Sequence, residues 1–435
     1  TLGCAKNEVD TDRMRALLLA SGFEETFDVE DADSAIVNTC SFLASATEES
    51  VEATLELAES RAEGVRSCPI IMCGCVPSRY GDDLPEQLPE VAAFVKAEDE
   101  DGIVDVVAGV LGVSVGAPVL DAGAMLRTVQ DASAFVKISE GCDRFCAFCA
   151  IPYIRGRYHS RPADEIVSEV SALMERGVRE VVLIGQDTGI WGSDFDDDET
   201  LAELLVRVAE VVRPYNGWVR VLYLQPEGMT DELIAAIRDT PEVLPYIDIP
   251  IQHCSARVLK AMGRSGDPQQ LHELFAKLRS EIPGMVLRTT GMAGFPGETD
   301  EEADELFDFI ESEEFDYTSV FAYSQEEGTR AAAMDGQVDE ETKLERTQRL
   351  IDLVEELGFS ATAKHVGERV EVIVDGVEET EDGVELIGHA WFQAPDCDGA
   401  VHIASGEAAV GDIVTVDLVD SFCYEMVGEI VKEVM

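Results

Sequence analysis

The 435-residue chain is predicted to be an α/β protein of three domains, because a chain of this length is too long for a single hydrophobic core. Strand and helix patterns alternate over the first 115 residues and then alternate again six times, which favours two parallel sheets covered by helices. Near residue 364 the hydrophobic period changes to two, which is typical of an antiparallel β-barrel. We therefore expect an N-terminal open parallel α/β sheet domain at 1–115, a partial TIM-like (βα)6 barrel at 128–360 and a small antiparallel β-barrel at 364–435.

The N-terminal segment alternates short apolar runs with helical patterns, as an open parallel sheet does. Two helices and two buried strands are expected there, at Asp10–Ala20, Ala35–Asn38, Thr47–Arg66 and Ile70–Met72. The first residues resemble the end of a further strand before Cys4, and Gly116–Arg127 is expected to be a linker.

The central segment carries six apolar runs of strand length. They are Phe135–Ile138, Glu180–Ile184, Val219–Leu224, Tyr246–Pro250, Val286–Thr290 and Thr318–Tyr323. Amphipathic helices lie between them, among them Asp164–Arg176, with Asp164 as the N-cap, and Asp267–Ser280. Six such units are fewer than a full barrel contains, and catalytic residues of this fold lie at the carboxyl ends of its strands.

The C-terminal segment follows a helix that is expected at Glu340–Leu357. Four strands of period two come next, at Val370–Val374, Leu386–Trp391, Ala400–Ile403 and Ile413–Val419. Residues 364–435 contain 17 Asp and Glu against 3 Lys and Arg, a net charge of −14. Such a surface repels a phosphate backbone.

The spacing Cys142-x-x-x-Cys146-x-x-Cys149, just after the first strand of the expected barrel, is the strongest chemical signal in the sequence. Three thiolates on one short loop can hold three irons of a 4Fe–4S cube and leave the fourth iron open. An open iron can chelate S-adenosylmethionine and pass it one electron. A zinc site is the alternative, but structural zinc needs four ligands, and the next candidate, His159, lies ten residues further on.

A second and more dispersed set consists of Cys4, Cys40 and Cys75, which lie about one βα unit apart and each follow an expected strand. Because the carboxyl ends of neighbouring parallel strands meet at one edge of a sheet, these thiols are expected to converge and could hold a second cluster. Buried thiols without a ligand are the alternative. Cys73 competes with Cys75 for the third position.

Three further loops follow barrel strands and could contact S-adenosylmethionine. Gln186 lies in a loop that could meet the amino group of the ligand, and Gln252 ends the fourth strand at the barrel mouth. The turn from Gly294 to Glu298 could let the backbone approach an adenine closely. The alternatives are an ordinary βα turn at Gln186, a satisfied structural histidine at His253, and a helix-capping turn after Gly294.

The chain is strongly acidic, with 88 Asp and Glu against 32 Lys and Arg and a net charge of −56. Such a surface favours a basic partner and does not favour nucleic acid, although an acidic proteome of the source organism would explain it equally well. Arg155, Arg157 and Arg161 follow the cysteine loop. These cations either hold carboxylates of a cofactor or substrate or balance nearby acids.

Cysteine usage and hydropathy indicate a cytoplasmic protein. The eleven cysteines are odd in number, clustered, and unaccompanied by an export signal, which favours reduced, metal-binding thiols over disulfides. The longest apolar runs have the length of strands, far below the roughly 20 residues that cross a bilayer. No membrane association is therefore expected.

With both cysteine sets in place, the chain resembles the methylthiotransferase family of radical S-adenosylmethionine enzymes along essentially its full length. The resemblance implies an N-terminal cluster domain, a partial barrel and a C-terminal TRAM domain. It implies two 4Fe–4S clusters, one on Cys4, Cys40 and Cys75 and one on Cys142, Cys146 and Cys149. It therefore favours Cys75 over Cys73.

Within this family the sequence is similar to the RimO branch, which modifies an aspartate of the small-subunit ribosomal protein numbered twelve. The other branch considered modifies an adenosine of tRNA. The matching segments are Leu2–Asn7, Lys137–Gly141, Gln186–Thr188, Tyr246–His253 and Ala394–Gly399. Ala5, Gln393 and Asp396 depart from the pattern of that branch.

The resemblance also implies a mechanism. The β-carbon of aspartate has no proton acidic enough for a side-chain base, so a hydrogen atom must be removed instead. One S-adenosylmethionine would methylate a sulfur at the N-terminal cluster, and a second would be cleaved at the barrel cluster to give the radical. Two open irons facing one cavity would supply proximity. An external electron donor, a sulfur donor and a basic ribosomal protein, free or in the assembled small subunit, would be the partners.

Overall fold

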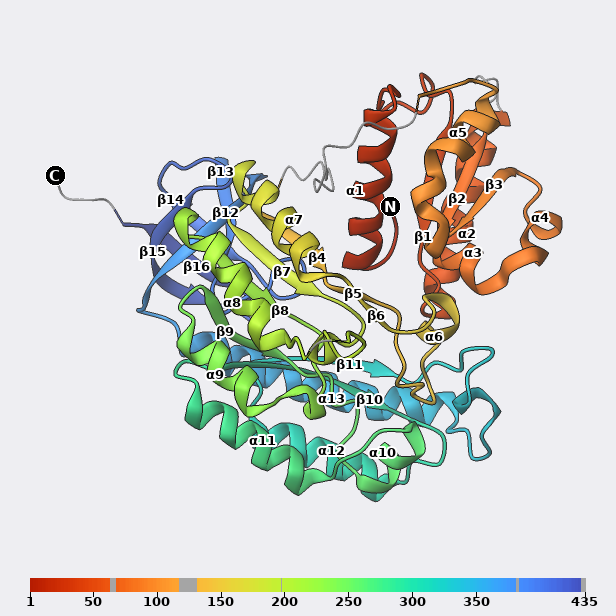
Figure 1. Cartoon of the computed structure of the whole chain (residues 1–435). Coiled ribbons are helices and arrows are strands. Elements are labelled where there is room, and N and C mark those ends of the chain that lie inside the picture. Colours follow the sequence, from red (N-terminus) through yellow and green to blue (C-terminus); the bar gives the residue numbers. More distant parts are fainter. Residues whose placement is uncertain (63–67, 117–130, 197, 381–382, 432–435) are drawn as a thin grey trace.

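The N-terminal domain is a three-stranded parallel sheet with helices on its faces (Figure 1). The computed structural model describes residues 1–62, 68–116, 131–196, 198–380 and 383–431. The strands lie in the order β1-β2-β3, at Ala35–Thr39, Ile70–Gly74 and Val91–Lys96. The helices are α1 (Ala5–Ala20), α2 (Ala44–Ala62), α3 (Cys75–Tyr80), α4 (Leu84–Gln87) and α5 (Ile103–Leu111).

The predicted parallel sheet is confirmed, but the prediction is wrong in two details. Strand β3 was not expected. No strand precedes Cys4, although the N–H of Leu2 donates to the carbonyl of Asn38 and so holds the first residues beside β1. The expected linker, apart from Gly116, and the last residues of the helix expected at Thr47–Arg66 lie outside the described residues.

The central domain is a six-stranded sheet in the order β11-β10-β9-β8-β7-β4, and all of its strand pairs are parallel. Its strands are β4 (Ser133–Lys137), β7 (Glu180–Ile184), β8 (Trp218–Val221), β9 (Val243–Asp248), β10 (Val286–Ala293) and β11 (Tyr317–Ala322). A small antiparallel pair, β5 (Ser139–Glu140) and β6 (His159–Ser160), lies beside the first strand. The six predicted strands of an incomplete barrel are thereby confirmed.

Helices cover one face of this sheet. They are α7 (Ala163–Glu175), α8 (Leu201–Val212), α9 (Asp231–Asp239), α10 (Ala256–Met262), α11 (Pro268–Glu281), α12 (Asp300–Glu313) and α13 (Glu340–Ala363), whereas α6 (Ile151–Ile154) packs against the start of α3. The predicted N-cap at Asp164 is wrong, because α7 begins one residue earlier, directly after the extended Pro162. Asp164 lies in the first turn instead, where its charge still complements the helix dipole. Asp267 is the N-cap of α11 and accepts from the N–H of Gln270.

The C-terminal domain is a closed five-stranded barrel in the order β12-β13-β14-β16-β15. The strands are β12 (Arg369–Thr380), β13 (Gly383–Ala390), β14 (Val401–Ser405), β15 (Ile413–Ser421) and β16 (Met426–Ile430). The fifth strand, β16, was not expected, and it pairs in parallel with β14, whereas the other pairs are antiparallel as predicted.

The small barrel packs against the sheet face that the helices leave uncovered. Inward side chains of the sheet, such as Val182, Leu222 and Tyr246, share one hydrophobic cluster with core residues of the small barrel, such as Val372 and Phe392. Alternate residues of the same strands, for instance Val181 and Leu183, pack against the helices. Both faces of the sheet are thus largely covered, apart from a cavity between β10, β11 and the small barrel that Arg288, Ser319 and Asp398 help to line. Within the described residues, no helix is both long and apolar enough to cross a bilayer.

Candidate active site

Cys142, Cys146 and Cys149 lie on one loop between β5 and α6, beyond the carboxyl end of β4. The backbone of this loop is tightly fixed. Gly141 has a φ of +73°, and a Cβ there would lie 2.7 Å from the carbonyl oxygen of Gly156 and would also strike that of Arg157. The N–H of Cys142 donates to the same Gly156 oxygen at 3.2 Å. The close approach therefore requires glycine directly before the first cysteine.

The three loop thiols are neighbours in a buried environment. Burial raises the pKa of all three thiols, and the charges of Cys146 and Cys142 help burial to raise that of Cys149 to about 12. Backbone N–H groups of Arg144 and Ile151 face Cys142 and Cys149 and lower their pKa in part. A metal deprotonates its thiol ligands, and N–H groups that point at sulfur stabilise the resulting thiolates. This arrangement therefore suits metal ligation.

The second cysteine set also converges. Cys40 directly follows β1 and Cys75 directly follows β2, as predicted, while Cys4 is the N-cap of α1. The buried Asn7 bridges two of the thiols, because its Oδ1 accepts from Cys4 Sγ at 3.4 Å and its Nδ2 lies 3.9 Å from Cys75 Sγ. The charges of Cys75 and Cys4 help burial to raise the pKa of Cys40 to about 11. The three sulfurs therefore share one site.

Cys73 lies elsewhere. It is fully buried within β2 and packs in a hydrophobic cluster with Met14, Leu17 and Ile71. The charge that acts on its thiol is that of Glu100, whereas the thiols of Cys4, Cys40 and Cys75 act on one another. The choice of Cys75 over Cys73 thus has a structural basis.

The distances between the thiols of each cysteine set decide whether the set could hold a single metal ion or a larger iron–sulfur cluster. In the described part of the chain, no three His, Cys, Asp or Glu side chains are arranged to hold one metal ion together. In a 4Fe–4S cube each iron takes its own thiolate, so the ligands surround a larger body than a single zinc ion. Both cysteine sets consist of free thiols that fit this donor chemistry.

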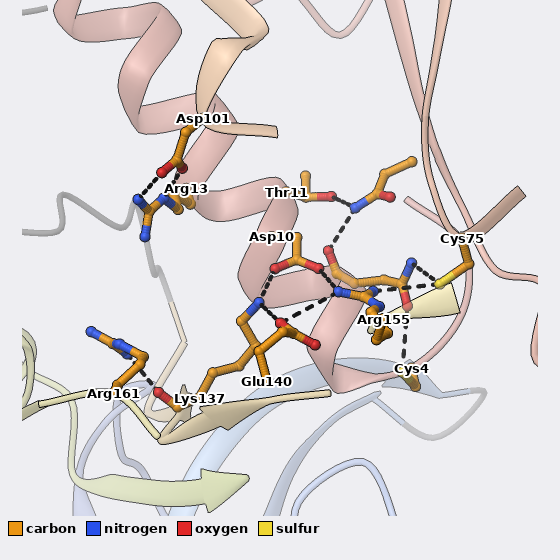
Figure 2. Close-up of polar contacts among 12 residues, drawn as sticks. Cys4, Asp10, Thr11, Arg13, Cys75, Asp101, Lys137, Glu140, Arg155 and Arg161 are labelled. Atoms are coloured by element: carbon orange, nitrogen blue, oxygen red, sulfur yellow. Dashed lines mark hydrogen bonds and ion pairs between the residues drawn. The ribbon is translucent and has the colours of Figure 1, made fainter. Parts of the chain in front are cut away.

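Arg155 joins the two cysteine sets. Cys75 packs in a buried cluster with Ala150 and Ile154, which directly follow the loop of Cys149. Figure 2 shows the guanidinium of Arg155 between Asp10 and Cys75, where it donates to Cys75 Sγ at 3.5 Å and to Asp10 Oδ2 at 2.6 Å. The two sets are therefore held against each other by direct contacts between the first two domains.

Lys137 and Glu140 complete this polar junction. The Nζ of Lys137 donates to Asp10 and, at 2.5 Å, to Glu140 Oε2, which also lies 3.7 Å from Arg155 Nη1 (Figure 2). Burial alone would raise the pKa of Glu140, but the charges of Lys137 and Arg155 bring it to about 2. The junction is thus charged, and its cations are matched by carboxylates of the chain itself.

The other arginines of the run also meet the chain's own acids. Arg157 pairs with the exposed Asp143, and Arg161 pairs with the buried Glu169 at 2.8 Å. Arg155, Arg157 and Arg161 thus each pair with an acid of the chain. This agrees with the interpretation that these arginines balance nearby acids.

Gln186 lies at the carboxyl end of β7 and faces the junction, since its Nε2 donates to Glu140 Oε1 at 2.7 Å. The next residue, Asp187, is fully buried and pairs with Arg144 of the cysteine loop. Burial raises the pKa of Asp187, while Arg144 lowers it. The loop after β7 is therefore tied both to the cysteine loop and to the junction.

Gln252, Gly294 and Glu298 follow β9 and β10. Gln252 has a φ of +68° and bridges to Gly291 of β10. The N–H of Gly294 donates to the buried Glu298 carboxylate at 2.7 Å, and Arg346 and His253 Nε2 also bind this carboxylate. Because His253 Nδ1 accepts from the backbone N–H of Cys254 and Ser255, both ring nitrogens are used, as a structural histidine requires.

Sequence reasoning missed Asp10, Lys137 and Glu140 as one unit. Asp10 was placed only at the start of a helix, and Lys137 and Glu140 only within a matching segment. The available signal was Asp10 on the same helix face as Val9, Met14 and Leu17, because a buried acid needs a partner.

Three family models match the chain. They are the "Radical SAM superfamily" at residues 136–310, the "Uncharacterized protein family UPF0004" at 1–96 and the "TRAM domain" at 366–431.

Curated relatives match over the full length. A protein of Pelobacter propionicus named "Ribosomal protein uS12 methylthiotransferase RimO" is 43% identical over 99% of this chain and 96% of its own. A protein of Trichlorobacter lovleyi with the same name is 42% identical over 100% and 97%.

Among solved structures, the radical S-adenosylmethionine methyltransferase TsrM from Kitasatospora setae shares the fold. With tryptophan and an S-adenosylmethionine analogue bound, it superposes with a TM-score of 0.54 at 15% identity, over 73% of this chain and 70% of TsrM. With cobalamin and a 4Fe–4S cluster bound, the TM-score is 0.52 over 71% of each chain. Together with the full-length relatives, this shows that the chain is an iron–sulfur transferase of the RimO family of radical S-adenosylmethionine methylthiotransferases.

Proposed function

We propose that the chain methylthiolates the β-carbon of an aspartate in ribosomal protein uS12, in the cytoplasm. The relatives that match its full length carry this substrate in their names. The observation that carries the proposal is the contact of Arg155 with Cys75, immediately beyond the loop of Cys142, Cys146 and Cys149. Insertion of sulfur into a C–H bond needs a sulfur carrier beside a radical source, and this contact holds two three-thiol sites together.

Each cysteine set is proposed to hold one 4Fe–4S cluster through three thiolates, with one iron left for another ligand. The ligands are Cys4, Cys40 and Cys75 in one set and Cys142, Cys146 and Cys149 in the other. When bound, the clusters and two molecules of S-adenosylmethionine would supply a methylthio group and the radical chemistry that removes the β-hydrogen.

The protein's own part is to hold these groups in place and exclude water. Gln186, Gln252 and Gly294 lie at the carboxyl ends of β7, β9 and β10, and we assign them to the S-adenosylmethionine site. Glu298 would position Gly294 in that site, because its carboxylate accepts a hydrogen bond from the Gly294 N–H at 2.7 Å. Asp10, Lys137 and Glu140 hold α1 against the barrel through the ion pairs of the junction. The closed C-terminal barrel fills the sheet face that would otherwise admit solvent.

The substrate is proposed to be a basic protein and not a nucleic acid. The net charge of −56 and the −14 of residues 364–435 favour a cationic partner and oppose phosphate backbones. An external electron donor and a sulfur donor are proposed in addition, because cleavage of S-adenosylmethionine consumes an electron and each transfer consumes a sulfur atom.

The test compares the two substrates of the two branches. The anaerobically reconstituted enzyme is incubated with S-adenosylmethionine, a reductant and either recombinant uS12 or total tRNA, and products are weighed by mass spectrometry. We expect uS12 to gain the mass of a methylthio group in place of one hydrogen, on an aspartate. Modification of a tRNA adenosine, with uS12 unchanged, would refute the proposal.

A further inference from the structure

Lys6, in the first turn of α1, is a buried cation on which the charges of Cys4, Glu140 and Asp248 act without a direct ion pair in the described residues. It is 8% exposed, and it makes no ion pair or hydrogen bond with any residue that the structure describes. Its Nζ lies 3.5 Å from the ring centroid of Tyr223, a cation–π contact. It also stands two residues after Cys4, beside the N-terminal cysteine set.

This isolation is unusual for the molecule. Acids outnumber Lys and Arg by 88 to 32, and three buried cations of the first two domains have carboxylate partners. Lys137 and Arg155 pair with Asp10, and Arg288 pairs with Asp248. The first turn of a helix also disfavours a cation, because the helix dipole is positive there. The start of a helix does not explain a buried ammonium at this position, and Glu140 and Asp248 act on it only from a distance, so no carboxylate of the described residues accepts a hydrogen bond from it.

The ring under Lys6 is held rigidly at the barrel mouth. Tyr223 follows β8, and its backbone adopts a φ of +64°, which is strained for a residue with a side chain. Its N–H donates to Asp248 Oδ2 at 3.1 Å, and its carbonyl accepts from Thr188 Oγ1 at 3.1 Å. Because the Tyr223 ring is fixed, the Lys6 ammonium that lies over it is held near the carboxyl ends of the strands. Catalysis takes place at that end of this fold.

We infer that Lys6 binds the side-chain carboxylate of the substrate aspartate and so holds the adjacent β-carbon beside the N-terminal cysteine set. The inference rests on the proposed function, because only an aspartate substrate places a carboxylate one bond from the reacting carbon. A charge-assisted hydrogen bond from a desolvated ammonium is among the stronger polar contacts a site can offer. It would also distinguish aspartate from asparagine.

The same chemistry could serve the carboxylate of S-adenosylmethionine, and the cation could also serve the thiolates of the N-terminal set. The experiment separates these roles. Binding of uS12 and of its variant with the target aspartate changed to asparagine is measured by calorimetry with reconstituted wild-type enzyme, Lys6→Met and Lys6→Arg. Iron content and S-adenosylmethionine affinity are measured on the same samples. Lys364→Met, at an exposed lysine after α13, is the matched control.

Wild-type enzyme and Lys364→Met are expected to prefer the aspartate form by about 10- to 100-fold, the range of a hydrogen bond to a charged group. Lys6→Met should bind both forms alike, Lys6→Arg should keep part of the preference, and iron content and S-adenosylmethionine affinity should not change. Retention of the preference by Lys6→Met, no preference in the wild type, or a loss of iron or S-adenosylmethionine affinity would each overturn the inference. The proposed function fails separately, if wild-type enzyme binds uS12 but adds no methylthio group.

Discussion

A buried histidine joins the C-terminal barrel to the central sheet, and its protonation is expected to control how firmly the two domains hold together. His389 of β13 is 2% exposed; its Nε2 lies 2.5 Å from Glu180 Oε2 of β7 and its Nδ1 lies 2.7 Å from Asp375 Oδ2. Burial lowers the pKa of His389, but the carboxylates of Glu180 and Asp375 raise it from 6.5 to about 9. Arg220, which pairs with the other oxygen of Glu180, completes the buried group.

The size of the effect follows from this difference in pKa. A pKa of about 9 in the folded chain against 6.5 in the unfolded chain corresponds to about 3 kcal/mol of stability. Because the folded pKa is the higher one, this contribution is fully present below pH 6.5 and is lost as the pH rises through about 9. The domain contact should therefore weaken in mildly alkaline solution.

The assay is urea unfolding of wild-type protein and His389→Gln at a series of pH values. Trp218 lies edge-on to His389, with ring centroids 5.9 Å apart, so its fluorescence reports on the contact. The free energy of unfolding of His389→Gln is expected to lie about 3 kcal/mol further below that of the wild type at pH 6 than at pH 10. Other titrating groups are the same in both proteins and cancel in this difference. A difference that does not change with pH would refute the assignment of a charged His389 between two carboxylates.

Two further changes probe the junction between the cysteine sets. Arg155→Met should lower the free energy of unfolding by about 3 kcal/mol in urea titrations, because the buried Asp10 loses one of its two cations and keeps Lys137. The exposed Arg157→Met should cost less than about 1 kcal/mol, and equal effects of the two would contradict the buried junction. Gly74→Ala should remove about four irons per chain, because its Cβ would lie 2.7 Å from the carbonyl oxygen of Thr39 and push Cys75 aside. Gly81→Ala, also at positive φ but in open space, should keep its iron, and full iron in Gly74→Ala would show that the glycine does not position the cysteine.

The parallel strands and the cysteine sets could be predicted because each leaves a local signal. Strands buried on both faces read as continuous apolar runs, as Glu180–Ile184 does, and its predicted bounds match β7. Cys40 and Cys75 could be placed together because each follows such a run at the same edge of the sheet. Cys4 was expected to end a strand, but it is the N-cap of a helix.

The strands that were missed lack such runs. The edge strand β3 reads Val-Ala-Ala-Phe-Val-Lys and is partly exposed, so its small residues give no strand pattern. In β16, Gly428 interrupts the apolar alternation, because a Cβ there would strike Val416 of β15. Glycine allows this close packing but has a low strand propensity, so Gly428 hides the strand from a sequence-based prediction.

Contacts between domains could not be predicted from local patterns at all. The ion pair of Asp10 with Arg155 joins residues 145 positions apart, and the pair of Glu180 with His389 joins residues 209 apart. Hydrophobic periodicity indicates that a helix or strand is buried but not what covers it. For this reason Lys6, whose partner ring Tyr223 lies in another domain, gave no signal in the sequence.

The central claim is that one chain carries two three-thiol sites, each for one 4Fe–4S cluster, with different tasks. Iron per chain and release of 5′-deoxyadenosine are to be measured after anaerobic reconstitution of the wild type and of two triple alanine variants. We expect about eight irons in the wild type and about four in each variant. The variant at Cys142, Cys146 and Cys149 should release no 5′-deoxyadenosine, whereas the variant at Cys4, Cys40 and Cys75 should still release it but transfer no sulfur to uS12. About four irons in the wild type, or sulfur transfer by either variant, would contradict the account.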